Sequence, residues 1–170
     1  MPRLHVCSLA RISETVTRTG ARSLVTLISP GTPVPRPIEI APHRHRYIAV
    51  HDIIAPNPGE VFPEREHLDD LLDFVRDWDR AEPMVIHCFA GVSRSTAAAF
   101  IAACALNPAR DEFAVARALR AASPTATPNA RLVALADHAL ERGGRMTAAI
   151  VEIGRGEMCF EGAPFTLDLA

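Results

Sequence analysis

Lysine is absent from this 170-residue sequence, and all 18 of its basic residues are arginine. Together with 28 alanines, this absence indicates a coding bias and no particular function. The formal net charge of −2 excludes a broad basic surface for nucleic acid, although it leaves room for a local anion-binding pocket. With 48% hydrophobic residues and so small a net charge, a disordered chain is also excluded.

Long apolar segments are missing as well. The longest membrane-like stretch, Thr96 to Leu106, has 11 residues, about half the length of a bilayer-spanning helix. The N-terminus lacks the charged head and apolar run of a secretory signal. We therefore expect a soluble, cytoplasmic protein with no membrane partner.

Closely paired cysteines are also absent. The four cysteines, Cys7, Cys88, Cys104 and Cys159, are widely spaced and form no CxxC pair, so we expect free thiols in a reducing compartment. Free cysteine commonly packs as a small apolar residue, which predicts that Cys7, Cys104 and Cys159 lie in the core. The alternative is a resolving role, in which one of them protects Cys88 as a disulfide.

Apolar periodicity predicts one α/β domain over residues 1–170, a length that suits a single sizeable core. Strands are expected at Leu4–Leu9, Ser23–Ile28, Tyr47–Ile54 and Met84–His87, and helices at Pro63–Arg80, Ser93–Leu106, Asp111–Ala122 and Asn129–Arg142. Five prolines make residues 30–42 a surface loop, because proline does not fit the interior of a sheet or helix. The tail, residues 146–170, is expected to form one short helix and then an irregular segment of unassigned role.

Several residues mark the ends of the expected helices. Asp111 and Asn129 stand where side-chain caps belong, and the pair Gly143-Gly144 is expected to close the helix that Asn129 begins. Glu64 and Glu66 stand in the expected first turn of the helix from Pro63, where the helix dipole favours acids.

The string His87-Cys88-Phe89-Ala90-Gly91-Val92-Ser93-Arg94-Ser95 joins an expected strand to an expected helix. A short loop with a central glycine can turn its backbone N–H groups inward, next to the free donors of a helix N-terminus, and this arrangement binds phosphate. The Arg94 guanidinium could close such a cradle with two parallel hydrogen bonds. Cys88 would lie at its floor, where N–H dipoles and an arginine favour the thiolate.

This string resembles the HC-x5-R-[S/T] motif of the cysteine-dependent protein tyrosine phosphatases, and its form HCxAGxSRS is similar to the dual-specificity branch. The resemblance implies a central, mixed, mainly parallel sheet flanked by helices. It also implies phosphate removal from phosphotyrosine, with phosphoserine and phosphothreonine as further substrates, through a phosphocysteine intermediate. Cys88 would be the nucleophile and Arg94, with the amides of Phe89, Ala90, Gly91, Val92 and Ser93, would hold the phosphate. Ser95 would stabilise the departing thiolate, and His87 would orient the loop.

The family mechanism also needs an acid for the leaving group, supplied by an aspartate on a loop after an earlier strand. Asp52 lies 36 residues before Cys88, at the end of an expected strand, and is our candidate. This gap is slightly longer than the commoner family spacing, and Asp52 could instead be a strand-end turn former. Glu60, Glu64 and Glu66 are the fallback acids.

A second resemblance lies in the segment Ser123 to Ala130, which is similar to the family's RPxxxPNxxF region. Pro128 and Asn129 match this pattern, whereas Ser123 replaces the leading arginine and Leu132 the aromatic residue. The resemblance spans residues 1–142, and Asn129 would support the site.

Competing interpretations remain open. One is a catalytically silent phosphate-binding module, and another is a sulfurtransferase or arsenate reductase that also uses a thiolate in an anion-binding loop. A solvated loop face is favoured for His43-Arg44-His45-Arg46 over a rim that attracts anionic substrates. A metal site from His43, His45, His51 and Asp52 matches no zinc-like ligand pattern. We therefore expect no metal or organic cofactor, a phosphorylated protein or small phosphomonoester as substrate, and a monomer.

Overall fold

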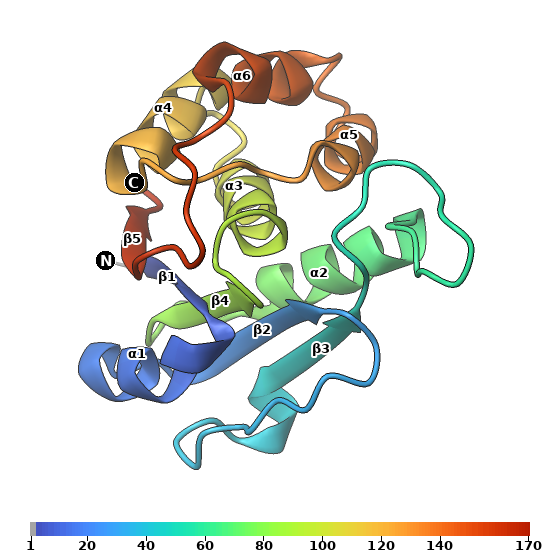
Figure 1. Cartoon of the computed structure of the whole chain (residues 1–170). Helices are drawn as coiled ribbons and strands as arrows, with labels where there is room; N and C mark the ends of the chain where they lie inside the picture. Colours follow the sequence, from blue (N-terminus) through green and yellow to red (C-terminus); the bar gives the residue numbers. More distant parts are fainter. Residues whose placement is uncertain (1–2) are drawn as a thin grey trace.

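The computed structural model describes residues 3–170 and places one five-stranded sheet at the centre of the molecule (Figure 1). The strands are β1 (Arg3–Ser8), β2 (Ser23–Ile28), β3 (His45–Ala49), β4 (Met84–Cys88) and β5 (Phe165–Asp168). The helices are α1 (Ile12–Thr19), α2 (Arg65–Asp77), α3 (Arg94–Leu106), α4 (Glu112–Ala122), α5 (Ala130–Ala139) and α6 (Arg145–Ile153). Short 3₁₀ turns cover Leu9–Arg11 and Pro42–Arg44.

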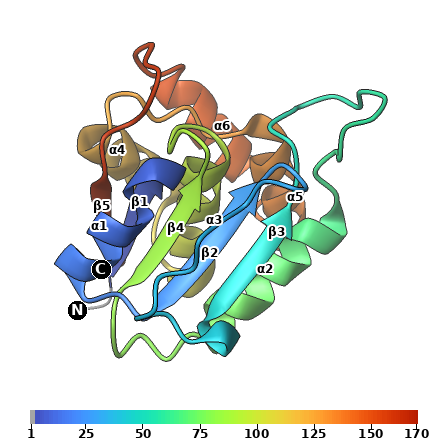
Figure 2. The ribbon, with the colours of Figure 1, turned by 60° about the horizontal axis from the view of Figure 1, so that its bottom comes forward.

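The strand order is β3-β2-β4-β1-β5. The first four strands are parallel, and β5 pairs antiparallel with β1 at the edge, with Val6 opposite Phe165. Helix α1 covers one face of the sheet, and α2 to α6 cover the other, as Figures 1 and 2 show. The expected mixed, mainly parallel sheet flanked by helices is confirmed.

Both faces of β2 are buried. This explains why apolar residues lie on both sides of Thr26 in this strand, without the alternation of apolar and polar residues that a half-exposed strand shows. The larger core lies between the sheet and helices α2 to α6, and includes Val25 and Ile86. The smaller core lies on the α1 side of the sheet. There Leu24, which precedes Val25, and Val85, which precedes Ile86, pack with Ile40 of the proline-rich loop. Alternate residues of one strand therefore serve two cores.

Helix α3 is the central helix, and every residue from Arg94 to Cys104 in it is buried. Its small apolar side chains allow close approach to the sheet on one side and to α2, α4 and α5 on the others. Because only residues 89–93 separate β4 from α3, this packing fixes the short loop between Cys88 and Arg94 against the core.

Several expected boundaries were wrong. Strand β3 ends at Ala49, so the segment up to Ile54 is not a strand and Asp52 lies in the following loop. Glu64 is the N-cap of α2, which begins one residue later, and the expected first-turn role applies only to Glu66.

The glycine pair closes no helix, because α5 ends at Ala139 and Gly144 is the N-cap of α6. Asp137 explains this second start. Its buried carboxylate accepts hydrogen bonds from the amides of Gly144, Met146 and Thr147, at 2.6, 2.7 and 3.1 Å, and so holds the first turn of α6.

The tail also departs from the expectation. Its short helix is α6, and residues 154–164 are irregular as expected, but the chain then forms β5. Pairing with the free edge of β1 turns Phe165 and Leu167 into the core. Cys7 and Cys104 are buried as predicted, whereas Cys159 is exposed because it lies in the irregular part of the tail. Within residues 3–170, no helix is long and apolar enough to cross a membrane.

Candidate active site at the end of strand β4

The segment from Cys88 to Arg94 forms a tight loop between β4 and α3. Gly91 stands at its middle with a φ of +72°, a conformation that side chains disfavour. A Cβ at this position would also lie 2.9 Å from backbone atoms of both Cys7 and Ser8. Glycine is therefore required twice over, by its conformation and by the close approach of β1.

The carbonyl groups of this loop are held by the surrounding segments. The bonds are Leu9 N to Phe89 O at 3.1 Å, Gly162 N to Ala90 O at 2.9 Å, Thr127 N to Val92 O at 2.9 Å and Asn129 N to Ser93 O at 3.2 Å. Within residues 3–170, no backbone N–H of Phe89 to Ser93 donates a hydrogen bond outside the regular ladders. Because the C=O and N–H of one peptide unit point in opposite directions, the loop amides point away from the segments that hold the carbonyls.

Cys88 is buried beneath this loop, and its Sγ lies 3.0 Å from the Oγ of Ser95 in the first turn of α3. The sequence predicts these two residues in one site, and the structure brings them into contact. At the two other buried thiols, burial raises the pKa of Cys7 to about 11 and that of Cys104 to about 12. Both therefore remain protonated near neutral pH.

The Arg94 guanidinium is positioned from one side only. Its Nη1 donates to the carbonyl of Val50 at 2.9 Å and to the Oγ of Ser29 at 3.3 Å, so the ends of β3 and β2 hold it. Its Nε is buried and has no hydrogen-bond partner within the described chain. A buried donor without a partner is costly, which makes this Nε a candidate ligand for an anion.

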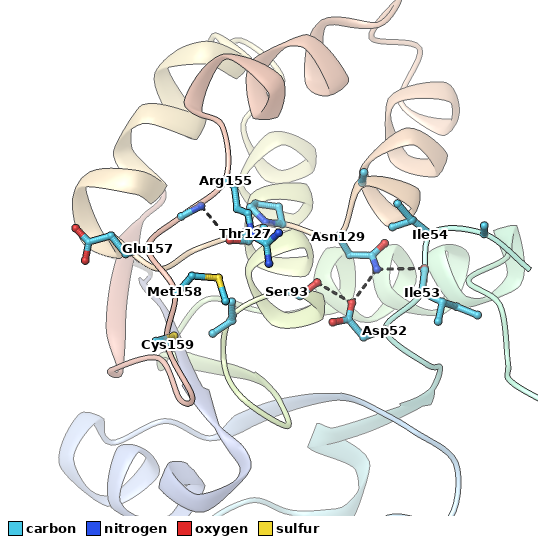
Figure 3. A pocket seen from close by; sticks show the side chains of 15 residues that line it. Asp52, Ile53, Ile54, Ser93, Thr127, Asn129, Arg155, Glu157, Met158 and Cys159 are labelled. Carbon is cyan, nitrogen blue, oxygen red and sulfur yellow. Dashed lines mark hydrogen bonds between the residues drawn. The ribbon is translucent and has the colours of Figure 1, made fainter. Parts of the chain in front are cut away.

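Asp52 lies beside the loop, in the segment after β3 (Figure 3). Its Oδ1 accepts a hydrogen bond of 2.6 Å from the Ser93 hydroxyl and one of 2.9 Å from the Asn129 amide. The other side of Asn129, its Oδ1, accepts from the amide of Leu132 at 3.0 Å and so caps α5. Asp111 likewise caps α4, so both expected caps are confirmed.

The fallback acids lie elsewhere. Glu60 accepts from Asn57 at the tip of the loop, and Glu64 pairs with Arg131 at 3.2 Å. Glu66 is exposed in the first turn of α2. None of these three carboxylates lines the pocket beside Ser93, whereas Asp52 does.

His87 belongs to a polar chain that runs through the sheet. Burial lowers its pKa to about 4, so its ring is neutral at pH 7. Its Nδ1 lies 3.0 Å from the Cys88 carbonyl, which can only accept, so Nδ1 carries the proton. The Nε2 of His87 then accepts from the Thr26 hydroxyl at 2.7 Å, and that hydroxyl accepts from the Nε2 of His45 at 2.8 Å.

The sequence did not predict the residues of other strands and loops that position His87 and Arg94. Thr26 and His45 position His87, and Ser29 and Val50 position Arg94. The only available signal was Thr26, because a polar residue within an apolar strand needs a buried partner. A backbone carbonyl such as that of Val50 has no signal in a sequence.

The two arginines of the segment His43-Arg44-His45-Arg46 form ion pairs, so this segment is not simply a solvated loop face. Arg44 contacts Asp79 at 3.1 Å and also Glu82, and Arg46 contacts Asp70 at 3.0 Å. Among residues 3–170, no group of three or more His, Cys, Asp or Glu side chains could hold a metal ion.

A pocket of about 680 Å³ opens beside the loop. Its walls come from four segments that are distant in the sequence, namely residues 52–55, 92–93, 127–130 and 155–159. The tail thus forms one wall and the loop that carries Asp52 forms another (Figure 3).

Comparisons with known proteins agree with this architecture. A family model described as PTP-like phytase, inositol hexakisphosphate, matches residues 55–105, which include the whole loop. No curated protein matches the chain significantly.

Three solved structures illustrate the similarity. Human DUSP28 is 21% identical, with 82% of this chain and 92% of that chain covered and a TM-score of 0.62. A mouse putative dual specificity phosphatase is 21% identical, with 86% of each chain covered and a TM-score of 0.62. DUSP15 is 20% identical, with 91% of this chain and 94% of that chain covered and a TM-score of 0.61. The chain therefore has the fold of the protein tyrosine and dual-specificity phosphatases, as the sequence resemblance implied.

Proposed function

We propose that this chain is a phosphomonoester hydrolase that acts on phosphotyrosine, and also on phosphoserine and phosphothreonine, through a phosphocysteine intermediate. The observation that carries the proposal is a set of donors without partners among residues 3–170. These donors are the amides of Phe89 to Ser93, in the loop that follows Cys88, and the buried Nε of Arg94 at the end of the same loop. Such donors suit a tetrahedral dianion, which accepts several charge-assisted hydrogen bonds.

In the first step, the Cys88 thiolate attacks the phosphorus and the bond from phosphorus to the leaving oxygen breaks. Asp52 gives its proton to that oxygen, so that phenol or alcohol departs instead of an anion. The loop amides and Arg94 stabilise the charge on the three equatorial oxygens. Because these groups supply the positive potential, the proposed reaction needs no metal ion.

In the second step, a water molecule attacks the phosphocysteine, and Asp52, now ionised, takes one of its protons. The bond between phosphorus and Sγ breaks, and the electron pair returns to Cys88. The Ser95 hydroxyl, 3.0 Å from Sγ, is in place to donate to the departing thiolate. His87 takes no proton in this scheme, and holds the Cys88 carbonyl through its Nδ1.

The test is hydrolysis of p-nitrophenyl phosphate by the purified protein, with EDTA and a reducing agent. Activity is expected to survive EDTA, to vanish in Cys88→Ser, and to fall severely in Arg94→Lys, because an ammonium cannot make the forked contact. Cys104→Ser is the matched control, since it alters a buried thiol in α3, outside the loop. Activity that persists in Cys88→Ser would overturn the proposal.

Inositol hexakisphosphate is a second candidate substrate, because the family model that matches residues 55–105 carries that description. A ligand with six phosphates needs several cations, and among the described residues that line the pocket beside the loop, Arg155 is the one basic side chain. The charge therefore favours a substrate with fewer phosphates. Phosphate release from inositol hexakisphosphate, measured beside a phosphotyrosine peptide, decides between the two.

The remaining alternatives have separate outcomes. A silent phosphate-binding module would bind a phosphopeptide with wild-type Cys88 and release no phosphate. An arsenate reductase would consume thiol only when arsenate is added, and would require a second cysteine. We further propose a cytoplasmic monomer without a nucleic-acid or membrane partner, which gel filtration and cell fractionation would test.

A further inference from the structure

The pocket beside the loop is larger than one phosphate needs. Its volume of about 680 Å³ lies in the range of pockets that hold whole ligands, and neither Cys88 nor Arg94 is among its lining residues. It touches the candidate site through Asp52, Asn129 and the loop residues Val92 and Ser93. A substrate with its phosphate on the 88–94 loop would therefore extend its neighbouring groups into this space.

Arg155 is the one cation among the described residues that line this pocket. Among the described residues, its guanidinium forms no ion pair or hydrogen bond, whereas Arg131 is bound to the Pro63 carbonyl and the Glu64 carboxylate. Figure 3 shows Arg155 over the pocket beside Thr127. An exposed cation with no partner of its own is available to a ligand.

The nearby carboxylates do not neutralise it. Glu157 also lines the pocket, but its side chain is directed away from Arg155 (Figure 3), and no salt bridge joins these two residues. Asp52 is engaged by Ser93 and Asn129. The rest of the lining is mainly apolar, with Val92 and Pro128 on one side and Met158 on the tail.

We propose that this pocket is a specificity site for the residue next to the phosphorylated one, and that Arg155 binds an anionic group there. This inference rests on the proposed phosphatase function. It assigns the tail a role in substrate choice, because the tail supplies both the arginine and the apolar wall. The preferred substrate is a phosphopeptide whose neighbouring residue carries a carboxylate or a second phosphate.

Matched phosphotyrosine peptides test the proposal, with aspartate, alanine, arginine or a second phosphorylated residue on either flank. The wild-type kcat/KM is expected to favour the anionic flank over alanine by roughly two- to fivefold, mostly through KM, as suits an exposed ion pair. The aspartate and doubly phosphorylated peptides distinguish a carboxylate from a phosphate as the group that Arg155 binds.

Substitutions at Arg155 sharpen the test. In Arg155→Ala the ratio of kcat/KM between anionic and alanine peptides is expected to fall close to one. In Arg155→Glu the preference is expected to move to the arginine peptide, which a general folding defect would not produce. Arg76→Ala is the matched control, since Arg76 is exposed on α2 and does not line the pocket, and its ratio is expected to equal the wild-type ratio.

Two results separate this inference from the proposed function. If wild type hydrolyses all peptides and the ratio is one, or is unchanged in both Arg155 variants, the specificity site is overturned while the hydrolase stands. If wild type hydrolyses none, calorimetric titration of Cys88→Ser with the same peptides decides. Binding that prefers the anionic flank and loses this preference in Cys88→Ser/Arg155→Ala upholds the site. Absence of that preference overturns it.

Discussion

The amide nitrogen of Gly162 lies 2.9 Å from the carbonyl oxygen of Ala90, and so the tail holds the outer side of the candidate phosphate loop. The loop also leaves no room for a side chain at this position, because a Cβ on Gly162 would lie 2.9 Å from the carbonyl oxygen of Gly91. The φ of Gly162 is not in the left-handed region, so other residues could adopt its backbone conformation. The constraint at this position is the neighbouring loop.

Gly162→Ala is therefore expected to displace the loop and leave the rest of the fold intact. A shift of about 1 Å in the loop amides is expected to lower kcat/KM for p-nitrophenyl phosphate by roughly 10- to 100-fold, and to weaken inhibition by inorganic phosphate. Ala163→Ser, at the exposed adjacent position, serves as the control and should keep wild-type activity. An unimpaired Gly162→Ala enzyme would show that the loop does not depend on the tail.

Asp52→Asn removes the proposed acid while its side chain keeps a similar shape. The expected loss in kcat is roughly 10²- to 10⁴-fold with a phosphotyrosine peptide, and less with p-nitrophenyl phosphate, because an acidic leaving group needs little protonation. Glu60→Gln changes a carboxylate on the same loop outside the pocket, and is expected to keep full activity. If the two variants behaved in the opposite way, the acid would be Glu60.

Asn129 caps α5 with its side-chain oxygen and donates to Asp52 with its side-chain nitrogen, and two substitutions separate these roles. Serine can cap α5 but cannot reach Asp52 as the amide does, whereas alanine does neither. Asn129→Ala is expected to lower the free energy of unfolding by about 1 kcal/mol, and Asn129→Ser by only a few tenths. Both are expected to lower kcat by a similar factor. Urea unfolding and steady-state kinetics on both variants provide the check. If kcat fell only in Asn129→Ala, the less stable variant, the role of Asn129 in positioning Asp52 would be contradicted.

His87 makes stability depend on pH. Its folded pKa is about 4 and the ordinary histidine value is 6.5, so between these pH values the unfolded chain binds more protons than the folded one. Stability is therefore full above about pH 6.5 and decreases as the pH falls toward 4, by up to about 3 kcal/mol. Burial also lowers the pKa values of His5 and His45, which adds to the same trend.

Urea unfolding of wild type at pH 7, 5.5 and 4.5 measures this dependence. His87→Gln is expected to be less stable at pH 7, because Thr26 and the Cys88 carbonyl lose a buried partner, but to lose less stability on acidification. Should that variant fail to fold, His45→Gln leaves His87 in place and is expected to keep most of the pH dependence. A flat profile in wild type would contradict a buried neutral His87.

The sequence predicted most of the fold because hydrophobic periodicity and caps are local signals. The apolar run of β2, the uniformly apolar α3 and the caps Asp111 and Asn129 were all recognisable in this way. The fifth strand was not, because β5 is short and becomes a strand only by pairing with the edge of β1. The end of β3 was misplaced for a related reason, since its apolar run continues into a loop that packs beside α5.

The fold class and the order of the chemical groups from Cys88 to Ser95 follow from the sequence alone, because those residues are neighbours and a strand followed by a helix leaves one compact loop between them. The contacts that hold this loop depend on tertiary packing: the Val50 carbonyl binds Arg94, Thr26 binds His87, and Gly162 binds Ala90. These contacts join residues more than 40 positions apart, and several use backbone groups that every residue possesses. No residue type identifies such a partner, so its position depends on how the sheet and the tail pack together.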